Sequence, residues 1–484
     1  MTQIISTLML IGGELVQASS GKTLDSLNPA TEELIGRIPA GDHKDVELAF
    51  AAANEAQQAW AETEMAHRAT LLRAVAAKVA KRADEILELE VLDTGNTITK
   101  MRGDVGMGIQ VLEYYAGLGI ELKGSTIPAS QKNLHFTLKD PYGVVGRIIP
   151  FNHPIMFALS RMAAPIMAGN AIIIKPPESS SLSAGILAEI CQEVLPPGLV
   201  NIVTGLGAEA GDAIVRHPHI KRLAFIGSVP TGLRIQRAAA EVAVKHVSLE
   251  LGGKNPMLIF PDVDPEVAAS AAVSAMNFAW QGQSCGSCSR LLVHESLYDE
   301  VLARVVAKTE KLVMGDPLDP KSEIGPMNSK MQLDKVEHYV QTAHADGARL
   351  MTGGQRPTDT DFERGYWHQP TVFADVTPEM RIGHEEIFGP VLSVFRWSDE
   401  AEAIRIANST EYGLTAAIWT NDLNAATRCM RKIKAGYVWI NGFSAHHLGT
   451  PFGGMGNSGI GREEGIEELL SYTETKTVHL ALQR

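Results

Sequence analysis

The sequence predicts an α/β protein with two parallel-sheet units, and three observations carry this prediction. From residue 143 onward, short apolar runs alternate with helical patterns, which is typical of parallel strands covered by helices on both faces. After residue 261 the alternation resumes with longer helices, which indicates a second unit. At 484 residues, the chain has room for roughly two or three domains and a large buried core.

The elements follow from these patterns in chain order. Strands are expected at the apolar runs 144–149, 171–174, 199–203, 223–226, 247–249 and 257–260, with helices among them at 181–194, 208–216 and 231–242. Beyond residue 261 we expect helices at 267–280, 297–313 and 330–345 and a strand at 291–293. Asp264 is the expected N-cap of the first of these helices, with Pro265 in its first turn. Ligands are expected at the carboxyl ends of the parallel strands.

The two ends of the chain lack the regular alternation of strands and helices. Residues 46–60 and 65–92 read as helices, and the segment 124–139 that follows them is polar and β-prone. Near the C-terminus, residues 472–482 alternate polar and apolar side chains, as a half-exposed strand does. Two strand-like segments outside the core favour pairing between subunits.

Composition excludes several classes of function. Lys and Arg number 43 against 56 Asp and Glu, and the net charge of −13 repels nucleic acids and anionic membranes. Four cysteines without regular spacing favour a reducing compartment over a disulfide framework. The first ten residues lack the pattern of a secretory signal, and we find no apolar run near the ~18 residues of a membrane span. We therefore expect a cytoplasmic protein.

Cys285 is the candidate nucleophile, because it stands among small residues on a connection between a predicted helix and a predicted strand. Gly282 allows a sharp turn there, and Glu250 upstream is a candidate carboxylate base. Other interpretations remain for this segment. Cys285 and Cys288 form a C-x-x-C, which suits a redox pair or half of a zinc site, and either thiol suits a buried structural role. The other two cysteines are isolated, so we expect no metal.

Three segments suggest a nucleotide site without the usual fingerprint. Residues 205–211 follow a strand, but their spacing is G-x-G-x-x-x-G rather than G-x-G-x-x-G. Residues 227–232 lie between a strand and a helix, where free amides could receive a phosphate. Lys175 and Glu178 follow a strand, where the carboxylate could accept ribose hydroxyls. A plain turn explains either glycine segment equally well, and an exposed ion pair explains the third.

These pieces occur together, in this order, in the aldehyde dehydrogenase superfamily, which the chain resembles over nearly its whole length. The motifs are Ile149-Pro-Phe-Asn-His-Pro154, Lys175-Pro-Pro-Glu178, Phe225-Ile-Gly-Ser228, Glu250-Leu-Gly-Gly-Lys254, Gly282-Gln-Ser-Cys285, Glu386-Ile-Phe-Gly-Pro390, Pro451-Phe-Gly-Gly454 and Ser458-Gly-Ile-Gly-Arg462. The resemblance implies two Rossmann-like domains and a β arm for oligomerisation. It places a cofactor domain at 1–120 and 141–252, a catalytic domain at 253–452, and the arm at 121–140 and 466–484.

The resemblance also implies catalytic roles. Cys285 matches the nucleophile because it precedes Arg290 by five residues, and Cys288 does not occupy that position. Glu250 matches the base that activates water. Asn152 matches the amide that forms an oxyanion hole with the backbone N–H of Cys285. The expected reaction is NAD-dependent oxidation of an aldehyde to the acid through a thiohemiacetal and a thioester.

The resemblance further implies the residues around a nicotinamide cofactor. They are Ile149, Pro150, Phe151, Lys175, Glu178, Gly207, Gly211, Phe225, Gly227, Ser228, Leu251, Glu386 and Phe388. Lys175 and Glu178 are expected to hold the adenosine ribose, Ser228 to meet the pyrophosphate, and Glu386 to hold the nicotinamide ribose beside Phe388. The carboxylate of Glu178 would repel a 2′-phosphate, so we expect NAD rather than NADP.

The expected substrate pocket departs from the common pattern of the family. Its residues are Met107, His153, Met156, Phe157, Ser160, Ala279, Ser284, Ser444, His446 and Phe452. His153, Ser160, Ala279 and His446 stand where aromatic residues are frequent, so the pocket is expected to be wider and more polar. Loss of the rings disfavours a quaternary ammonium aldehyde and favours a medium-sized aromatic or oxygenated one. The alternative is that both histidines are solvated at the pocket mouth.

Two other functions and one regulatory hypothesis remain open at this point. A CoA-acylating relative would resolve the thioester with a thiol, although Glu250 favours water. A non-catalytic homologue would keep the fold alone, although Cys285, Glu250 and Asn152 are all present. Oxidation could join Cys285 to Cys288 in a reversible disulfide. The expected partners are a small aldehyde and further copies of the chain, as a dimer or a tetramer.

Overall fold

The computed structural model describes residues 4–482, whose strands form four sheets. The largest sheet has eight strands in the order β20-β12-β11-β8-β9-β10-β2-β3. Its five central strands are mutually parallel, and the strands at its two edges are antiparallel. The strands are β2 (Met9–Ile11), β3 (Glu14–Val16), β8 (Val144–Ile148), β9 (Ala171–Lys175), β10 (Val200–Ile202), β11 (Arg222–Ile226), β12 (His246–Glu250) and β20 (Gly459–Ile460). The predicted α/β class is confirmed.

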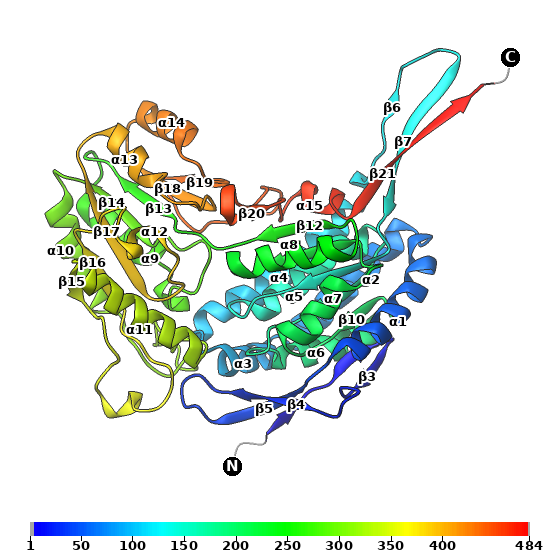
Figure 1. Ribbon diagram of the computed structural model, residues 1–484, viewed down its shortest axis with the longest axis horizontal. Helices are drawn as coiled ribbons and strands as arrows, with labels where there is room; N and C mark the ends of the chain where they lie inside the picture. The colour runs from blue at the N-terminus through cyan, green and yellow to red at the C-terminus, as the bar shows by residue number, and fades with distance from the viewer. Residues whose placement is uncertain (1–3, 483–484) are drawn as a thin grey trace.

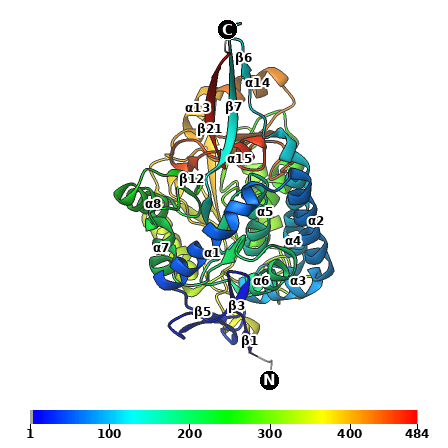
Figure 2. The same cartoon turned by 90° about the vertical axis from the view of Figure 1, so that its right-hand side faces the viewer.

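Helices cover both faces of this sheet, as Figure 1 and Figure 2 show. They are α1 (His43–Ala61), α2 (Met65–Lys81), α3 (Ala83–Thr94), α4 (Ile98–Leu118), α5 (Pro154–Met167), α6 (Leu182–Val194), α7 (Asp212–Arg216) and α8 (Val229–Val242). The single helix expected at 65–92 is in fact two, because the backbone of Arg82 leaves the helical region with φ −107° and ψ 15°. No glycine or proline marks this break, so the sequence pattern does not reveal it.

A seven-stranded sheet forms the second unit, in the order β15-β16-β17-β14-β13-β18-β19. All its neighbouring strands are parallel except β15, which pairs antiparallel with β16. The strands are β13 (Pro256–Ile259), β14 (Arg290–His294), β15 (Arg349–Thr352), β16 (Thr371–Ala374), β17 (Val391–Trp397), β18 (Thr415–Trp419) and β19 (Tyr437–Ile440). The run 257–260, which continued the first series in the sequence, therefore belongs to this sheet as β13. Strand periodicity cannot tell which of two sheets a strand joins.

The helices of the second unit are α9 (Pro265–Ala275), α10 (Tyr298–Thr309), α11 (Lys330–Ala345), α12 (Arg381–His384), α13 (Glu400–Ala407) and α14 (Leu423–Lys432). Asp264 caps α9 as predicted, accepting from the backbone N–H groups of Glu266 and Val267 at 2.8 and 3.1 Å. The helix expected at 267–280 ends early, at Ala275. Asn277 and Gln281 adopt left-handed backbone angles, with φ of +57° and +52°, on either side of a 3-10 turn at Phe278–Trp280.

A three-stranded sheet of β6 (Thr126–Ile127), β7 (Asn133–Pro141) and β21 (Thr473–Ala481) projects away from the two larger sheets (Figure 1). Strand β7 pairs antiparallel with β21 from Asn133 to Pro141. The two strand-like segments of the sequence thus pair within one chain. The short helix α15 (Ile466–Leu470) leads into β21. A fourth sheet, β1 (Ile5–Ser6), β5 (Leu34–Pro39) and β4 (Thr23–Leu27), lies near the N-terminus.

Each large sheet has its own hydrophobic core. The clusters around the eight-stranded sheet and the seven-stranded sheet share no buried residue. Throughout residues 4–482, every helix is too short or too polar to cross a membrane.

Candidate active site

A cavity of about 830 Å³ is lined by residues from both large units. The carboxyl ends of β8, β9, β11 and β12 form one wall, and α11 with the segments around Cys285 and Glu386 forms the other. Carboxyl ends of parallel strands are where this class of sheet receives ligands. The cavity is therefore the first candidate for the functional site.

Glu250 and Cys285 both line this cavity. Glu250 is the last residue of β12, and Cys285 lies on the loop between the Phe278–Trp280 turn and β14. Gly282 shapes this loop with φ +66°, and a side chain at Gly282 would overlap the carbonyl oxygen of Gly389. A larger residue at that position would therefore strain this path of the loop.

The carboxyl group of Glu250 and the thiol of Cys285 both resist ionisation. Burial, with the nearby negative charge of Glu463, raises the pKa of Glu250 to about 8. Burial, with the charge of Glu250, raises the pKa of the Cys285 thiol well above its usual range. A carboxyl group with a pKa near neutrality is suited to exchange protons, as a general base must. A thiol with so raised a pKa would need a neighbouring base to lose its proton.

Asn152 completes the group at the cavity. It lies on the turn between β8 and α5, and one hydrogen of its Nδ2 is donated to the carbonyl oxygen of Gln283 at 3.0 Å. A primary amide carries two N–H donors, so the second remains free. Asn152 is 5 % exposed, and its Oδ1 has no hydrogen-bond partner. An anchored amide with a free N–H matches the requirements of an oxyanion hole.

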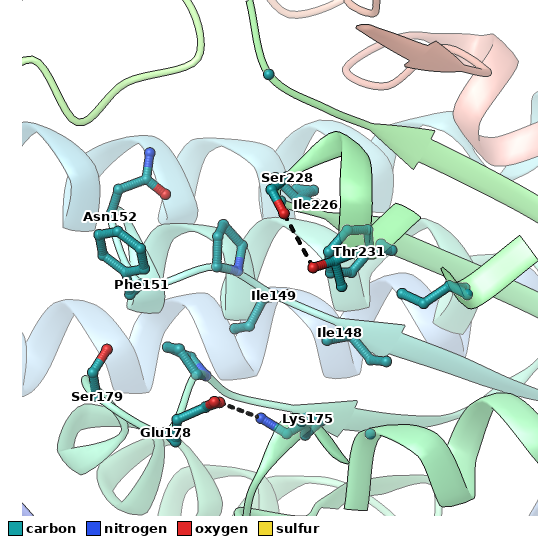
Figure 3. Close-up of a pocket in the computed structure, with 18 of the residues that line it drawn as sticks. Ile148, Ile149, Phe151, Asn152, Lys175, Glu178, Ser179, Ile226, Ser228 and Thr231 are labelled. Carbon is teal, nitrogen blue, oxygen red and sulfur yellow. Dashed lines mark hydrogen bonds and ion pairs between the residues drawn. The ribbon is translucent and has the colours of Figure 1, made fainter. Parts of the chain in front are cut away.

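Lys175 and Glu178 line the same cavity, and Figure 3 shows their side chains facing each other. The Lys175 Nζ donates to Glu178 Oε2 at 3.1 Å. Burial opposes ionisation of Glu178, but the Lys175 charge and a hydrogen bond from the Gly207 N–H outweigh it and lower the pKa of the carboxyl. Glu178 is thus an anionic acceptor with its side chain half exposed to the cavity, which suits the hydroxyls of a ribose.

The N-terminus of α8 opens into the same cavity beside Gly227 and Ser228 (Figure 3). Ser228 is the N-cap residue, yet its hydroxyl donates to Thr231 Oγ1 at 3.0 Å and caps no backbone N–H. The first N–H groups of the helix therefore lack a side-chain partner. Free amides at a helix N-terminus favour an anionic group such as a pyrophosphate.

Glu386 and Phe388 line the part of the cavity nearer to Cys285. Glu386 Oε1 accepts from the backbone N–H of Gly253 at 3.0 Å. Burial raises the pKa of Glu386, although the charges of Lys335 and Lys254 oppose this. Phe388 has a left-handed backbone, with φ +58°, and its ring meets that of Phe151 edge to face at 5.7 Å.

The cavity brings together the predicted catalytic and cofactor residues with one exception. Leu251 is buried and does not line the cavity, because its side chain packs beside Gly232 of α8. Other residues that line the cavity are not predicted from the sequence. Asn328, Ser329, Met331, Gln332 and Lys335 come from the start of α11 and the segment before it. The helix itself was predicted correctly, but its pattern gives no sign of what its first turns face.

The residues expected in the substrate pocket lie outside the lining of this cavity. His153 Nδ1 lies 2.7 Å from Asp104 Oδ2, and the His153 ring packs near Phe157 and Trp280, with centroids 5.7 and 5.5 Å away. Phe157 and Ser160 belong to α5, which packs against α4, the helix that carries Asp104 and Met107. Ser160 is buried, and its hydroxyl has no partner.

A second group gathers around His446. Its Nδ1 lies 2.9 Å from Glu464 Oε2, and its ring packs near Tyr437, Trp439 and Phe452. Both histidines predicted for the pocket thus carry a carboxylate partner and aromatic neighbours. Each histidine side chain is only partly exposed, 12 % for His153 and 27 % for His446, so neither is fully surrounded by water.

Cys288 differs sharply from Cys285 in its surroundings. It is 1 % exposed and packs in the apolar cluster between α9 and the seven-stranded sheet. Burial raises the pKa of its thiol to about 12. A thiol in such a place is a poor partner for disulfide exchange, so the structure gives the redox hypothesis no support. In the described part of the chain, no three metal-binding side chains come together.

Comparison with known proteins identifies the family. The model of the aldehyde dehydrogenase family matches residues 15–478. Aldehyde dehydrogenase tropH of Talaromyces stipitatus is 46% identical over 95% of this chain and 90% of its own length. The peroxisomal aminoaldehyde dehydrogenase 1 of Malus domestica is 42% identical over 98% of this chain and 96% of its own.

The fold comparison agrees. The NAD+ complex of an aldehyde dehydrogenase from Bacillus cereus superimposes with a TM-score of 0.96, at 38% identity, over 99% of this chain and 97% of that one. Sequence and fold give the same answer along almost the whole length. The chain therefore belongs to the aldehyde dehydrogenase family and is an oxidoreductase that acts on aldehydes.

Proposed function

We propose that this protein oxidises an aldehyde to the carboxylic acid with NAD as cofactor, through covalent intermediates on Cys285. One observation carries the proposal. Cys285, Glu250 and Asn152 line the same cavity as the Lys175–Glu178 pair and the N-terminus of α8. A nucleophile, a base and an oxyanion donor thus share one cavity with groups suited to a nucleotide.

The first step is attack of the Cys285 sulfur on the aldehyde carbon. The carbonyl π electrons move to oxygen, and the thiol proton passes to the Glu250 carboxylate. The free N–H of Asn152 and the backbone N–H of Cys285 then donate to the new oxyanion of the thiohemiacetal. Removing one donor from such a hole typically costs about a hundred- to a thousandfold in rate.

The polar groups along the cavity support NAD as the cofactor. Lys175 and Glu178 would hold the adenosine ribose, the α8 N-terminus the pyrophosphate, and Glu386 the nicotinamide ribose. When bound, NAD supplies the acceptor for the hydride that the thiohemiacetal carbon loses. The relative from Bacillus cereus was solved as an NAD+ complex.

The last step is hydrolysis of the thioester. Once Glu250 has released the first proton to solvent, its carboxylate takes a proton from water, the resulting hydroxide adds to the acyl carbon, and the C–S bond breaks to release the acid and the Cys285 thiolate. The same carboxylate thus serves both halves of the reaction. Its raised pKa keeps it basic enough to accept a proton near neutral pH.

The test is NADH formation over a broad panel of aldehydes, with Cys285→Ala as the control. We expect NADH and the carboxylic acid in equal amounts, and no NADH from the variant. Acyl-CoA formed in place of the acid when CoA is present would identify a CoA-acylating enzyme. A protein that binds NAD but oxidises no aldehyde would be a non-catalytic homologue.

The preference for NAD over NADP rests on Glu178. Its ionised carboxylate, held beside Lys175, would repel a 2′-phosphate on the adenosine ribose. We expect kcat/KM to be higher with NAD, and Glu178→Ser to reduce the difference. A higher kcat/KM with NADP in the wild-type enzyme would contradict this assignment.

We propose a medium-sized aromatic or oxygenated aldehyde as substrate. The support is the polar surroundings of the predicted pocket, where the hydroxyls of Ser160 and Ser444 lack partners and two histidines are held by carboxylates. The Malus domestica relative is named for amino aldehydes. Cationic substrates are therefore part of the panel. Unchanged KM values across it after His153→Phe and His446→Phe would rule out a role for these histidines.

We further propose a cytoplasmic homodimer or homotetramer, with a cofactor domain at 1–120 and 141–252, a catalytic domain at 253–452 and an oligomerisation arm at 121–140 and 466–484. The arm supports this proposal because its strands carry exposed apolar side chains. They are Ile127, Leu134, Leu138 and Leu480. Open sheet edges with apolar side chains favour pairing with another copy.

A further inference from the structure

Asn96 is a fully buried amide on the connection between α3 and α4, and none of the roles assigned above uses it. The connection begins at Gly95, whose left-handed backbone, with φ +77°, ends α3. Gly95 packs closely against Gly325 and Pro326 of the second unit. Asn96 is therefore fixed at a place where both units meet.

Its side chain contacts two segments that build the catalytic group. Asn96 Nδ2 donates to the backbone carbonyl oxygen of Asn152 at 2.9 Å. The Gln281 amide is oriented so that both its nitrogen and its oxygen have hydrogen-bond partners. In this orientation its nitrogen donates to Asn96 Oδ1 at 3.0 Å. Asn96 thus bridges the turn that carries Asn152 and the segment that leads to Cys285.

The Asn152 residue is consequently held at both ends. Asn96 binds its backbone carbonyl, and the Gln283 carbonyl binds one hydrogen of its side-chain amide at 3.0 Å. Asn96, Asn152 and Gln283 are 1 %, 5 % and 2 % exposed, so water does not compete for these bonds. In such a place a hydrogen bond fixes geometry strongly, because breaking it leaves a buried polar group without a partner.

We propose that Asn96 is a positioning residue that aims the free N–H of Asn152 at the oxyanion formed on Cys285. It does not touch the reacting atoms. Its effect is to keep the donor and the nucleophile at a fixed separation across the two units. The inference rests on the proposed role of Asn152 in the oxyanion hole.

Two reactions of the Cys285 thiol separate positioning from general damage. Acylation by p-nitrophenyl acetate forms a C–S bond through a tetrahedral oxyanion, and p-nitrophenolate leaves. Alkylation by iodoacetamide displaces iodide at a saturated carbon and forms no oxyanion. Neither reaction needs an aldehyde or NAD. Only the first depends on where Asn152 points.

We expect Asn96→Ala to slow acylation by about 10- to 100-fold, as displacement of a catalytic group by about 1 Å does, and to leave alkylation unchanged. The loss should appear in kcat for ester hydrolysis, with KM for the ester unchanged. Asn96→Asp keeps the shape of the side chain but removes its N–H donors, and should behave in the same way. It serves as a second variant if Asn96→Ala does not fold, which thermal unfolding reports.

Asn201→Ala is the matched control. Asn201 is also a fully buried asparagine, with Oδ1 accepting from Gly12 N at 2.9 Å and Nδ2 donating to the Gly198 carbonyl at 2.7 Å, and it lies away from the cavity lining. We expect both reactions to proceed at wild-type rates in this variant. In an Asn152→Ala background, Asn96→Ala should cause no further loss, because Asn96 acts through Asn152.

The proposal is overturned if acylation and alkylation fall together in the folded Asn96 variants, if acylation keeps its wild-type rate, or if the losses in the double variant add. These outcomes are distinct from failure of the proposed aldehyde oxidation. A wild-type protein that is acylated by the ester but oxidises no aldehyde would refute the oxidation and leave the positioning role intact. A wild-type protein that is alkylated but never acylated would contradict both.

Discussion

Glu250 is the residue whose chemistry is most clearly set by its surroundings. It ends a buried strand, and burial together with the charge of Glu463 raises its pKa to about 8. The same carboxylate raises the pKa of Cys285 in turn. The Cys285 thiol is therefore ionised with difficulty beside this carboxylate, whereas its hydrogen bond to Glu250 lowers the pKa of the carboxyl group and only partly offsets the effect of burial.

The first prediction concerns the pH dependence of activity. Only the ionised form of Glu250 can accept a proton, so we expect the rate of acid formation to rise with pH until about pH 8 and then to level off. Glu250→Gln should lower kcat by about 10²- to 10⁴-fold and abolish this rise. The measurement is a pH–rate profile for both proteins under single-turnover conditions. A wild-type rate that is flat across this range would contradict the assignment.

The second prediction concerns the effect of pH on the free energy of unfolding. A carboxyl group whose pKa is raised on folding, from 4.5 to about 8, binds its proton more tightly in the folded state. The free energy of unfolding therefore falls as pH rises through this window, and its loss is complete above about pH 8. We expect Glu250→Gln to be stabilised relative to wild type at alkaline pH and to differ less below pH 4.5. Denaturant unfolding at several pH values measures this difference.

At the scale of elements, the early end of α9 matters most. A helix continued to Trp280 would remove the turns that bring Cys285 to the cavity, and Asn277, Gln281 and Gly282 prevent it with left-handed backbones. Three such residues within six positions indicate a segment held in place by its surroundings. The apolar spacing of 267–280 did not reveal the break, because it reports only which face is buried.

The third prediction tests the turn at Gly282. A side chain at this position would overlap the Gly389 carbonyl oxygen, whereas Gly21, with a similar φ of +68°, has open space around it. We expect Gly21→Ala to cost about 1–2 kcal/mol of stability from backbone strain alone. Gly282→Ala should cost about 1–3 kcal/mol more, because the added atom must also be accommodated in a packed region. Thermal unfolding of both variants measures the two losses, and equal losses would show that packing at Gly282 is unimportant.

Most residues of the candidate site can be predicted from the sequence, but the contacts that bring them together cannot. Lys175 and Glu178 could be named from their place after a predicted strand, whereas Glu386 could be named only through the resemblance of its motif to that of the family. The α11 residues that line the cavity could not, since an amphipathic helix shows which face is buried and not what its first turns approach. The role of Asn96 is also invisible in sequence, because it depends on contacts with residues far along the chain. The contacts between the two units can therefore be known only from the structure.

At the scale of the molecule, a buried ionic network ties the segment before β21 to the eight-stranded sheet. Arg161 of α5 reaches Glu463 at 3.0 Å and Glu468 at 3.3 Å, and Arg147 of β8 reaches Glu463 at 2.6 Å. Breaking one partner of such a network leaves an uncompensated buried charge, which is strongly destabilising. Buried ion pairs therefore anchor the base of the projecting arm to the core.

The last prediction concerns this arm, whose strands present Leu134, Leu138 and Leu480 to solvent in the single chain. If these side chains are covered by another copy, replacing Leu138 and Leu480 by Glu should split the assembly into smaller species, because burying two carboxylates in an apolar contact is costly. Leu423→Glu, at an exposed leucine of α14 far from the arm, is the control and should leave the assembly intact. Sedimentation velocity measures the outcome.

Unchanged sedimentation of the arm variant would show that the arm is not an interface, and monomeric wild-type protein would show that the chain does not associate. Because the cavity is lined by residues of a single chain, the split species should still bind NAD.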